Sequence, residues 1–330
     1  AVTAASLLLP TSVWDTSYIA VSAGQAGPSG TPLLTLVARE NNTHVTLRPK
    51  VAVVGGANVA GGPANTPLQY TLARGEALQI NQSLELTGSQ LLADRPFAVF
   101  GGSTCLNVPT NAYACDGAHQ QIPPIHALGH SYAAVRYRNR DPKKEEAPPW
   151  RLVGAADGTQ LIWSPKKPVG APDTLEFGQI AVFNDPGPFT VRSQAEDHPF
   201  YASAYMTGGG DFDGSGDPEW VNLIPSAQYQ KRYIFFTDPT YSETELVVVR
   251  REEDGAFADV KLDCAGDLVA WKPLGEGLQW TRVQLVTGNF KNVGNCANGR
   301  HVISSAKPFG VTVWGWGSAA SELLYTKYVS

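Results

Sequence analysis

The sequence predicts an all-β protein built from three tandem, mutually packed units that each resemble a β-sandwich. Three observations support this prediction: short apolar stretches separated by turn residues, a composition poor in charge, and two motifs that each occur three times. The chain of 330 residues contains 33 Gly and 24 Pro, and only 17% of its residues are charged. Such a composition favours strands and turns over helices with charged faces.

Each unit opens with a proline that stands eight residues before a tyrosine. The three pairs are Pro10 and Tyr18, Pro124 and Tyr132, and Pro225 and Tyr233. An apolar or aromatic stretch follows each tyrosine, and such stretches are typical of strands. We therefore expect each tyrosine to lie near the start of a strand, in a setting common to the three units.

Each unit continues with a strand, a tight turn and a second strand. The strand pairs are expected at residues 34–38 and 43–47, 151–155 and 159–163, and 246–250 and 259–262. The turns contain Asn41-Asn42, Asp157-Gly158 and Asp254-Gly255. These residues tolerate the positive φ that hairpin turns require, so each pair is predicted to form a hairpin.

Each unit closes with a Pro-Phe pair at the start of a strand, where the missing N–H of proline costs least. The pairs are Pro96-Phe97, Pro199-Phe200 and Pro308-Phe309. The predicted units span residues 1–118, 119–220 and 221–330, and without long linkers they should pack on one another. The alternative is a single large β domain in which the Pro-Phe pairs recur by coincidence.

The four cysteines form two pairs that are close in sequence. Cys105 lies near Cys115, and Cys264 and Cys296 bracket part of the third unit. Neither spacing matches the C-x-x-C of zinc or redox sites. The even number and the composition of an exported protein predict two disulfides, and hence an oxidising compartment. Four buried, reduced thiols are the alternative.

The charge distribution argues against several classes of partner. The net charge is −5, and lysines pair only locally, at Lys143-Lys144 and Lys166-Lys167, so no nucleic-acid partner is expected. No apolar run is long enough to span a membrane. The sequence begins at Ala1, which fits either a removed signal peptide or one never included. We expect an exported protein, extracellular or at the cell surface.

The junctions between the units carry a family resemblance. The first contains Cys105-Leu106-Asn107-Val108-Pro109, Ala114-Cys115-Asp116 and residues 120–124, and the second contains Gly216-Asp217-Pro218-Glu219-Trp220 and Ile224-Pro225. Together with the stretch from Pro308 to Gly315, they resemble the IgG Fc-binding protein N-terminal domain family. The resemblance covers nearly the whole chain. It implies an extracellular or cell-surface module with adhesive or binding roles and without known catalytic residues.

The family occurs both in animal mucus-associated proteins and in bacterial surface proteins. High Ala, Gly and Pro with little Lys points to a bacterial source. The second closing strand departs from the pattern because it lacks the Gly-Phe-Gly ending. The resemblance alone does not establish antibody binding for this chain.

One loop has the spacing of a calcium site. Oxygen ligands recur at every second residue, at Asp211, Asp213, Ser215, Asp217 and Glu219. Calcium takes six to eight oxygen ligands, often on a Gly-rich turning backbone. The loop is not a complete EF-hand, since no flanking helices are predicted. Its alternative is a solvated acidic loop, part of which is the family's junction motif.

Aromatic residues offer a second candidate site. Trp314 and Trp316 lie two residues apart and therefore share a strand face. Trp150 follows Pro148-Pro149 in a charged loop, where it is expected to be exposed. These three residues are candidates for stacking against a sugar or another ligand. The alternative is that they fill the sandwich cores.

Three histidines lie close in sequence, at positions 119, 126 and 130. His126 and His130 would share one face of a helix and could bind zinc there. Pro123-Pro124 and Gly129 oppose a helix, so surface or hydrogen-bonding roles are favoured.

No catalytic motif is present: the chain lacks G-x-S-x-G, H-E-x-x-H and a P-loop. The preferred hypothesis is an adhesion or ligand-binding module, not an enzyme, with a protein or glycan partner at the cell surface or matrix. One alternative is a self-associating structural subunit of a surface assembly. A second is a carbohydrate-active enzyme with a carboxylate pair in a cleft between units.

Overall fold

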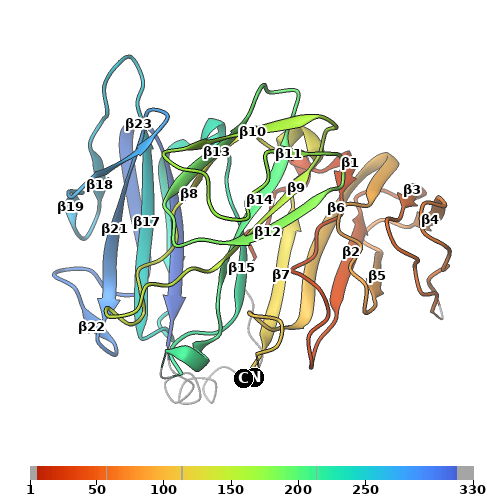
Figure 1. The fold of residues 1–330 in the computed structure, drawn as a ribbon, viewed down its shortest axis with the longest axis horizontal. Coiled ribbons are helices and arrows are strands. Elements are labelled where there is room, and N and C mark those ends of the chain that lie inside the picture. Colours follow the sequence, from red (N-terminus) through yellow and green to blue (C-terminus); the bar gives the residue numbers. More distant parts are fainter. Residues whose placement is uncertain (1–5, 57, 113, 213, 318–330) are drawn as a thin grey trace.

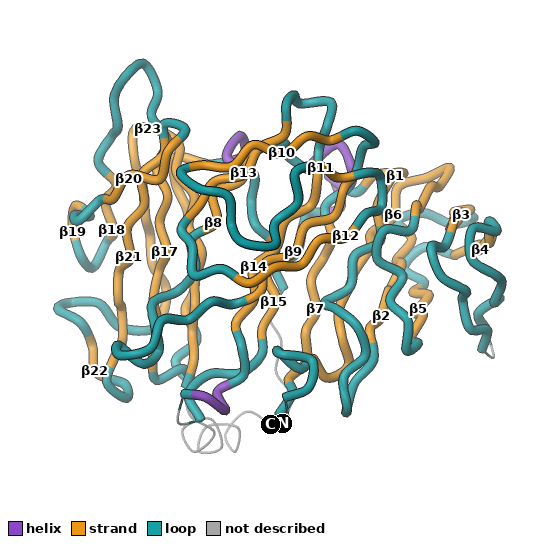
Figure 2. The backbone as a smooth tube through the Cα atoms, viewed as in Figure 1, coloured by secondary structure: helices purple, strands orange, loops and turns teal. Residues whose placement is uncertain are grey.

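The chain folds into antiparallel strands, as predicted. The computed structural model describes residues 6–56, 58–112, 114–212 and 214–317, and within them the only helices are single 3-10 turns. Strands β1 to β7 form unit 1, β8 to β15 unit 2 and β16 to β23 unit 3. Figures 1 and 2 show the three units side by side in chain order along the long axis. The all-β fold class is confirmed.

Unit 1 contains η1 (Thr11–Val13), β1 (Asp15–Ile19), β2 (Pro32–Ala38), β3 (Thr43–Arg48), β4 (Leu68–Leu72), β5 (Ala77–Asn81), β6 (Gln90–Leu106) and β7 (Asp116–Ile122). Unit 2 contains η2 (Ile125–Ala127), β8 (Ser131–Ala134), β9 (Pro149–Gly154), β10 (Thr159–Ser164), β11 (Thr174–Leu175), β12 (Ile180–Asn184), β13 (Phe189–Ser193), β14 (Phe200–Met206), η3 (Gly209–Asp211) and β15 (Glu219–Asn222). Unit 3 contains η4 (Ser226–Gln228), β16 (Gln230–Thr237), β17 (Glu243–Arg251), β18 (Val260–Leu262), β19 (Gly266–Asp267), β20 (Lys272–Gly275), β21 (Leu278–Thr287), β22 (Lys291–Asn292) and β23 (Gly299–Trp316).

Each unit has two packed sheets with similar strand order, which are separate in unit 2 and share one long strand in the others, β6 in unit 1 and β23 in unit 3. The first, which we call the A-sheet, runs β4-β3-β6-β1 in unit 1, β11-β10-β13-β8 in unit 2 and β19-β18-β23-β16 in unit 3. The second, the B-sheet, runs β5-β2-β6-β7, then β12-β9-β14-β15, then β21-β17-β23, with β20 and β22 added to β21. Apolar side chains of both sheets meet in each unit's core, as in sheets packed face to face.

A phenylalanine marks the place where the chain passes from one sheet to the other. In unit 1, Phe97 on β6 pairs with Asp15 in the A-sheet and with Ala38 in the B-sheet. In unit 3, Phe309 on β23 pairs likewise with Gln230 and Arg250. Unit 2 divides the same path into two strands, β13 and β14, and Phe200 begins the second.

The opening and closing motifs meet through a tyrosine hydroxyl in every unit. The hydroxyl donates to the carbonyl oxygen of the closing phenylalanine: Tyr18 to Phe97 at 2.8 Å, Tyr132 to Phe200 at 2.7 Å and Tyr233 to Phe309 at 2.7 Å. It also accepts the backbone N–H three residues before it, from Asp15, Gly129 and Gln230. The ring centroids of each pair lie 4.9, 5.0 and 5.1 Å apart. The expected common setting of the three tyrosines is therefore present, whereas triplication of one ancestral unit stays a prediction.

The strand bounds and pairings of the structure can be compared with the predicted unit boundaries and the predicted hairpins. The predicted boundary at 118/119 falls inside β7, which pairs with β6 of unit 1. The boundary at 220/221 falls inside β15, which pairs with β14 of unit 2. The three strand-turn-strand segments are present, but the hairpin interpretation was wrong. β2 and β3 do not pair with each other, and β9 and β10 lie in different sheets, because each tight turn carries the chain across the sandwich.

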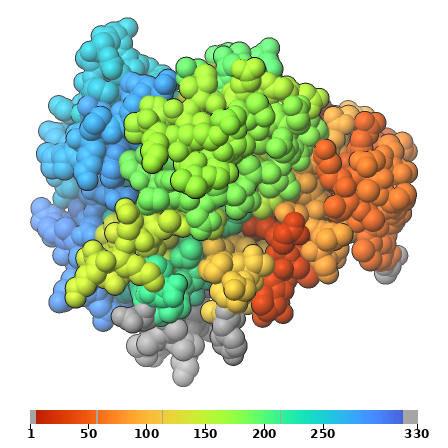
Figure 3. Space-filling view, viewed as in Figure 1, coloured from red at the N-terminus to blue at the C-terminus, as the bar shows by residue number. Residues whose placement is uncertain are grey.

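Alternate residues of each B-sheet serve two cores. In unit 2, Phe200 and Ala202 belong to the unit's own core, whereas Tyr201 and Tyr205 join the buried cluster of unit 1. Unit 3 repeats this arrangement, since Val248 lies in its own core and Val247 and Val249 join that of unit 2. Because strand side chains alternate between faces, the outer faces of the B-sheets of units 2 and 3 each pack on the preceding unit. Figure 3 shows the resulting continuous surface.

A buried ion pair joins units 1 and 2. Arg151 Nη2 lies 2.5 Å from Glu85 Oε2, and both side chains are 4% exposed. The same carboxylate also accepts hydrogen bonds from Thr87 Oγ1 at 2.7 Å and Gln25 Nε2 at 2.8 Å. Burial raises the pKa of the nearby Tyr205 hydroxyl to about 12, so it remains a neutral donor to Ala23 O. Loss of one partner of such a pair would leave the other charge buried and uncompensated.

Replacement of Tyr132 with phenylalanine tests the importance of the tyrosine contact. The substitution keeps the ring but leaves the Gly129 N–H and the Phe200 carbonyl without this partner. We expect the free energy of unfolding in urea to fall by about 1–3 kcal/mol. Tyr18→Phe should behave alike, and Tyr233→Phe should cost less because Tyr233 is half-buried. Unchanged urea midpoints for Tyr132→Phe and Tyr18→Phe would contradict this role.

Candidate functional site

A hollow opens where unit 2 meets unit 3. Its volume is about 720 Å³. Arg138 comes from the segment after β8, whereas Glu245 and Arg282 come from β17 and β21 of unit 3. The Cys264–Cys296 disulfide forms part of the wall. A smaller hollow of about 460 Å³ lies between units 1 and 2 and includes Lys50 and Asp157.

Two arginines in the larger hollow are fixed on tryptophan rings. The guanidinium carbon of Arg138 lies 5.0 Å from the centroid of Trp316, and that of Arg282 lies 4.7 Å from Trp280. Arg138 Nη2 donates to Glu243 Oε2 at 2.7 Å. Arg282 donates through Nε and Nη2 to the carbonyl oxygen of Arg136, at 3.0 and 2.8 Å. Stacking and hydrogen bonds together hold both cations in place.

The carboxyl of Glu245 lies between these cations. Its Oε1 accepts the Arg138 backbone N–H at 2.8 Å and lies 3.8 Å from Arg282 Nε. Burial raises the pKa of Glu245 to about 7, and the charges of Arg282 and Arg138 only partly oppose that effect. The site therefore contains a carboxyl group that changes charge near neutral pH.

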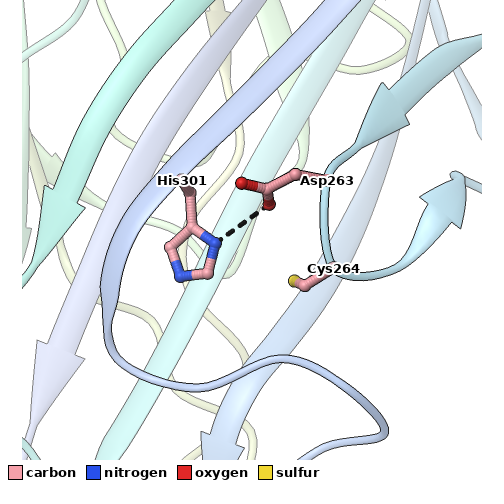
Figure 4. Close-up of side chains that lie close together, drawn as sticks. All are labelled: Asp263, Cys264 and His301. Atoms are coloured by element: carbon pink, nitrogen blue, oxygen red, sulfur yellow. Dashed lines mark hydrogen bonds and ion pairs between the residues drawn. The ribbon is translucent and has the colours of Figure 1, made fainter.

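His301 and Asp263 lie beside Cys264, one of the two disulfide cysteines, as Figure 4 shows. His301 Nδ1 lies 3.1 Å from Asp263 Oδ1, and His301 Nε2 lies 2.8 Å from Ala297 O. Burial opposes ionisation of Asp263, but hydrogen bonds from His301 and the Val302 N–H outweigh it and lower the pKa of Asp263. These contacts tie the segments that carry Cys264 and Cys296 to the start of β23.

Asp263, Cys264 and His301 lie close enough together to resemble a metal site. The chemistry of the three donors does not fit a metal. The Cys264 sulfur is bonded to Cys296, so it cannot act as a thiolate ligand. Each ring nitrogen of His301 already faces an oxygen atom. We assign the cluster a structural role.

The acidic loop is organised largely by the chain's own cations. Arg140, whose side chain is fully buried, donates to the carbonyl oxygens of Thr207 and Ser215 at 2.8 and 2.9 Å, and its guanidinium lies 4.1 Å from the Phe212 ring. Asp211 is exposed and lies 3.8 Å from Lys144 Nζ.

The remaining predicted calcium ligands differ in their surroundings. Asp213 lies outside the described residues. Glu219 begins β15, where burial raises its pKa to about 8, with a smaller contribution from the charge of Asp116. Asp217 is half-buried. Calcium binding at this loop stays a prediction.

The tryptophans predicted to bind a ligand are buried. Trp150 is 1% exposed, Trp314 3% and Trp316 2%. The expected exposure of Trp150 was wrong because its ring packs edge-on against Phe189 while its indole N–H donates to Asp185 O. Trp314 and Trp316 both pack near Tyr137 of unit 2. None of the three offers the free face that stacking on a ligand needs.

Both predicted disulfides are present. Cys105 is bonded to Cys115, and Cys264 to Cys296. Around the histidines the chain forms a single 3-10 turn and no α-helix that would place His126 and His130 on one face. His126 lies in the single-turn η2 and its Nδ1 lies 2.6 Å from Asp15 Oδ2, whereas His119 stacks on Phe100.

Sequence reasoning missed the residues of the larger hollow. The available signal was the alternation of arginines at positions 136, 138 and 140, which is conspicuous in a chain with few charges. A complementary pattern lies on β17, where acidic residues alternate at positions 243 and 245. Pairing the two patterns requires knowledge that unit 3 packs on unit 2.

A comparison with protein-family models identifies the family of this chain. The model described as IgGFc binding protein matches residues 4–315, which is nearly the whole chain. The chain belongs to the IgGFc binding protein family. No curated protein and no solved structure gives a significant match. The family is not a known enzyme family, and membership together with two disulfides indicates an extracellular protein. Within the described residues, no helix has the length and apolarity to cross a membrane.

Replacement of Glu245 with glutamine tests the electrostatics of the hollow. The raised pKa means that folded Glu245 keeps its proton between about pH 4.5 and 7, where the unfolded chain ionises. Its contribution to stability is therefore lost as pH rises through that interval. Relative to the unmodified protein, Glu245→Gln should gain about 1–3 kcal/mol between pH 5 and pH 8 in urea unfolding.

Glu196→Gln is the control, because Glu196 is exposed and should show no such difference. If Glu245→Gln were to follow the pH dependence of the unmodified protein, Glu245 would have to be ionised throughout this range.

Proposed function

We propose that this member of the IgGFc binding protein family is a non-catalytic adhesion module that binds a protein partner at a cell surface or in the surrounding matrix. The observation that supports this most directly is the hollow between units 2 and 3. It gathers arginines, a titrating carboxyl group and a disulfide in an open recess of about 720 Å³. Arginine is enriched in protein interfaces, where its planar group donates several hydrogen bonds.

Preorganisation favours recognition at this place. The guanidinium groups of Arg138 and Arg282 are already held by tryptophan rings and backbone oxygens, so little side-chain entropy remains to be lost on binding. The disulfide and the His301–Asp263 pair fix the opposite wall. A protein loop with acidic or amide groups suits such a surface. A glycan partner, calcium binding and a bacterial source remain further proposals.

A binding measurement with a blocked hollow tests this function. The family's name makes the Fc fragment of IgG the first probe, and purified mucin and a glycan array are further probes. Asn295 is exposed on the wall of the hollow, so Asn295→Trp should fill the recess without disturbing a core. We expect saturable binding of the unmodified protein to a protein probe in biolayer interferometry, and at least tenfold weaker binding by Asn295→Trp.

Val169→Trp is the matched control, since Val169 is 82% exposed and lies in unit 2 away from the hollow. It should bind like the unmodified protein. If Asn295→Trp bound the probe as tightly as the unmodified protein, the binding site would have to lie outside the hollow. Absence of binding to every probe would contradict the adhesive function.

A further inference from the structure

The first A-sheet strand of each unit and the residues directly after it carry two apolar side chains at corresponding positions. They are the first and third residues after the motif tyrosine, and they alternate with residues that face the unit's own core. Their exposed fractions differ sharply between units: Ile19 0% and Val21 0% in unit 1, Ala133 8% and Val135 5% in unit 2, but Ile234 55% and Phe236 66% in unit 3. Unit 3 thus exposes the largest apolar pair of the series.

Where a following unit exists, it packs against the A-sheet that carries this pair. At the first junction, η2 lies against β1, and His126 bonds to Asp15. At the second, Pro225, just before η4, touches Gly129, where an added Cβ would lie 2.2 Å from the proline Cβ. Arg192 on β13 also pairs with Glu276 beyond β20 at 3.1 Å. No described segment packs on β16 in this way.

The surface that a following unit uses is also defined. It is the outer face of the B-sheet. One residue on this face can be compared between units, namely the strand partner of the residue directly after the closing phenylalanine. That residue is Val153 in unit 2, opposite Tyr201, and Val249 in unit 3, opposite Gly310. Both are buried against the preceding unit.

Unit 1 has the same surface, and within the described residues no other unit packs on it. Its corresponding residue is Val37, which pairs with Ala98, the residue after Phe97. Val37, Thr35 and Phe100 are only half-buried there. In the part of the chain that the structure describes, one face of each kind therefore has no unit packed on it, one on unit 3 and one on unit 1.

We propose that these two faces bind each other between two copies of this chain. The outer B-sheet face of unit 1, around Val37, covers Ile234 and Phe236 of a second copy, as unit 2 covers unit 1 within the chain. The contact is head-to-tail and joins different surfaces, so it produces either a closed ring or an extended filament. This assembly is independent of the hollow between units 2 and 3 and of the proposed adhesive function.

Two complementary variants test the arrangement. Phe236→Asp removes the face on unit 3 and leaves that on unit 1, whereas Val37→Asp does the reverse. Sedimentation velocity over a concentration series should show self-association of the unmodified protein, weakened at least tenfold in each variant alone. A mixture of the two variants should form a one-to-one dimer, because it retains one intact pair of faces. Val169→Asp is the surface control and should assemble like the unmodified protein.

Thermal melting of each variant separates lost assembly from lost folding, since both substituted side chains are partly or largely exposed. A strictly monomeric unmodified protein would overturn the proposal. So would self-association of Val37→Asp alone, which would indicate a symmetric contact through β16. Failure of the mixed variants to form a dimer, while each is folded, would overturn it as well.

Discussion

In each unit, the fold depends on the contact between a tyrosine hydroxyl and the carbonyl oxygen of a phenylalanine. That phenylalanine lies where the chain leaves the A-sheet and enters the B-sheet, so the hydrogen bond fixes the point at which the two sheets join. The hydroxyl is buried in units 1 and 2, where an unpaired polar group is costly. The hydrogen bond therefore ties the strand that contains the tyrosine to the strand that contains the phenylalanine, and the apolar core of the unit closes around both.

The same architecture places charged groups at the joints between units. Glu85 and Arg151 meet in the first joint, and Glu245 lies between Arg138 and Arg282 in the second. The ion pair of the first joint is buried, with both side chains 4% exposed, whereas the arginines of the second joint border the larger hollow. Packing between units thus creates the recess, and the loops and the Cys264–Cys296 disulfide give it walls. The binding function proposed for this family member follows from the way the units meet, since no single unit contains the whole set.

Local patterns predicted the repeating elements well. The spacing from proline to tyrosine marked each opening strand because 3-10 turns and strand alternation depend on neighbouring residues. The nearby cysteines likewise indicated their disulfides. The pairing of strands was harder to predict from the sequence. The turn at Asp157-Gly158 has the residues typical of a hairpin, although the chain crosses between two sheets there. The exposure of Trp150 was misjudged because its polar, proline-rich neighbours say nothing of the Phe189 ring that covers it. Glu245 and Arg282 escaped notice since their association with Arg138 exists only across a joint between units.

Among the residues that the structure describes, unit 2 is the unit that packs on both of the others, one on each broad face. A substitution on either face of unit 2 disturbs its packing against a neighbouring unit. Unit 2 is therefore constrained by two interfaces at once. Over evolutionary time, its residues should accordingly drift more slowly than those of units 1 and 3. Lengthening of the array by duplication is easiest at an end, where an added unit requires no existing joint to be rebuilt. Members of the family with more than three units, if they arose in this way, should keep a unit like this one at each interior position.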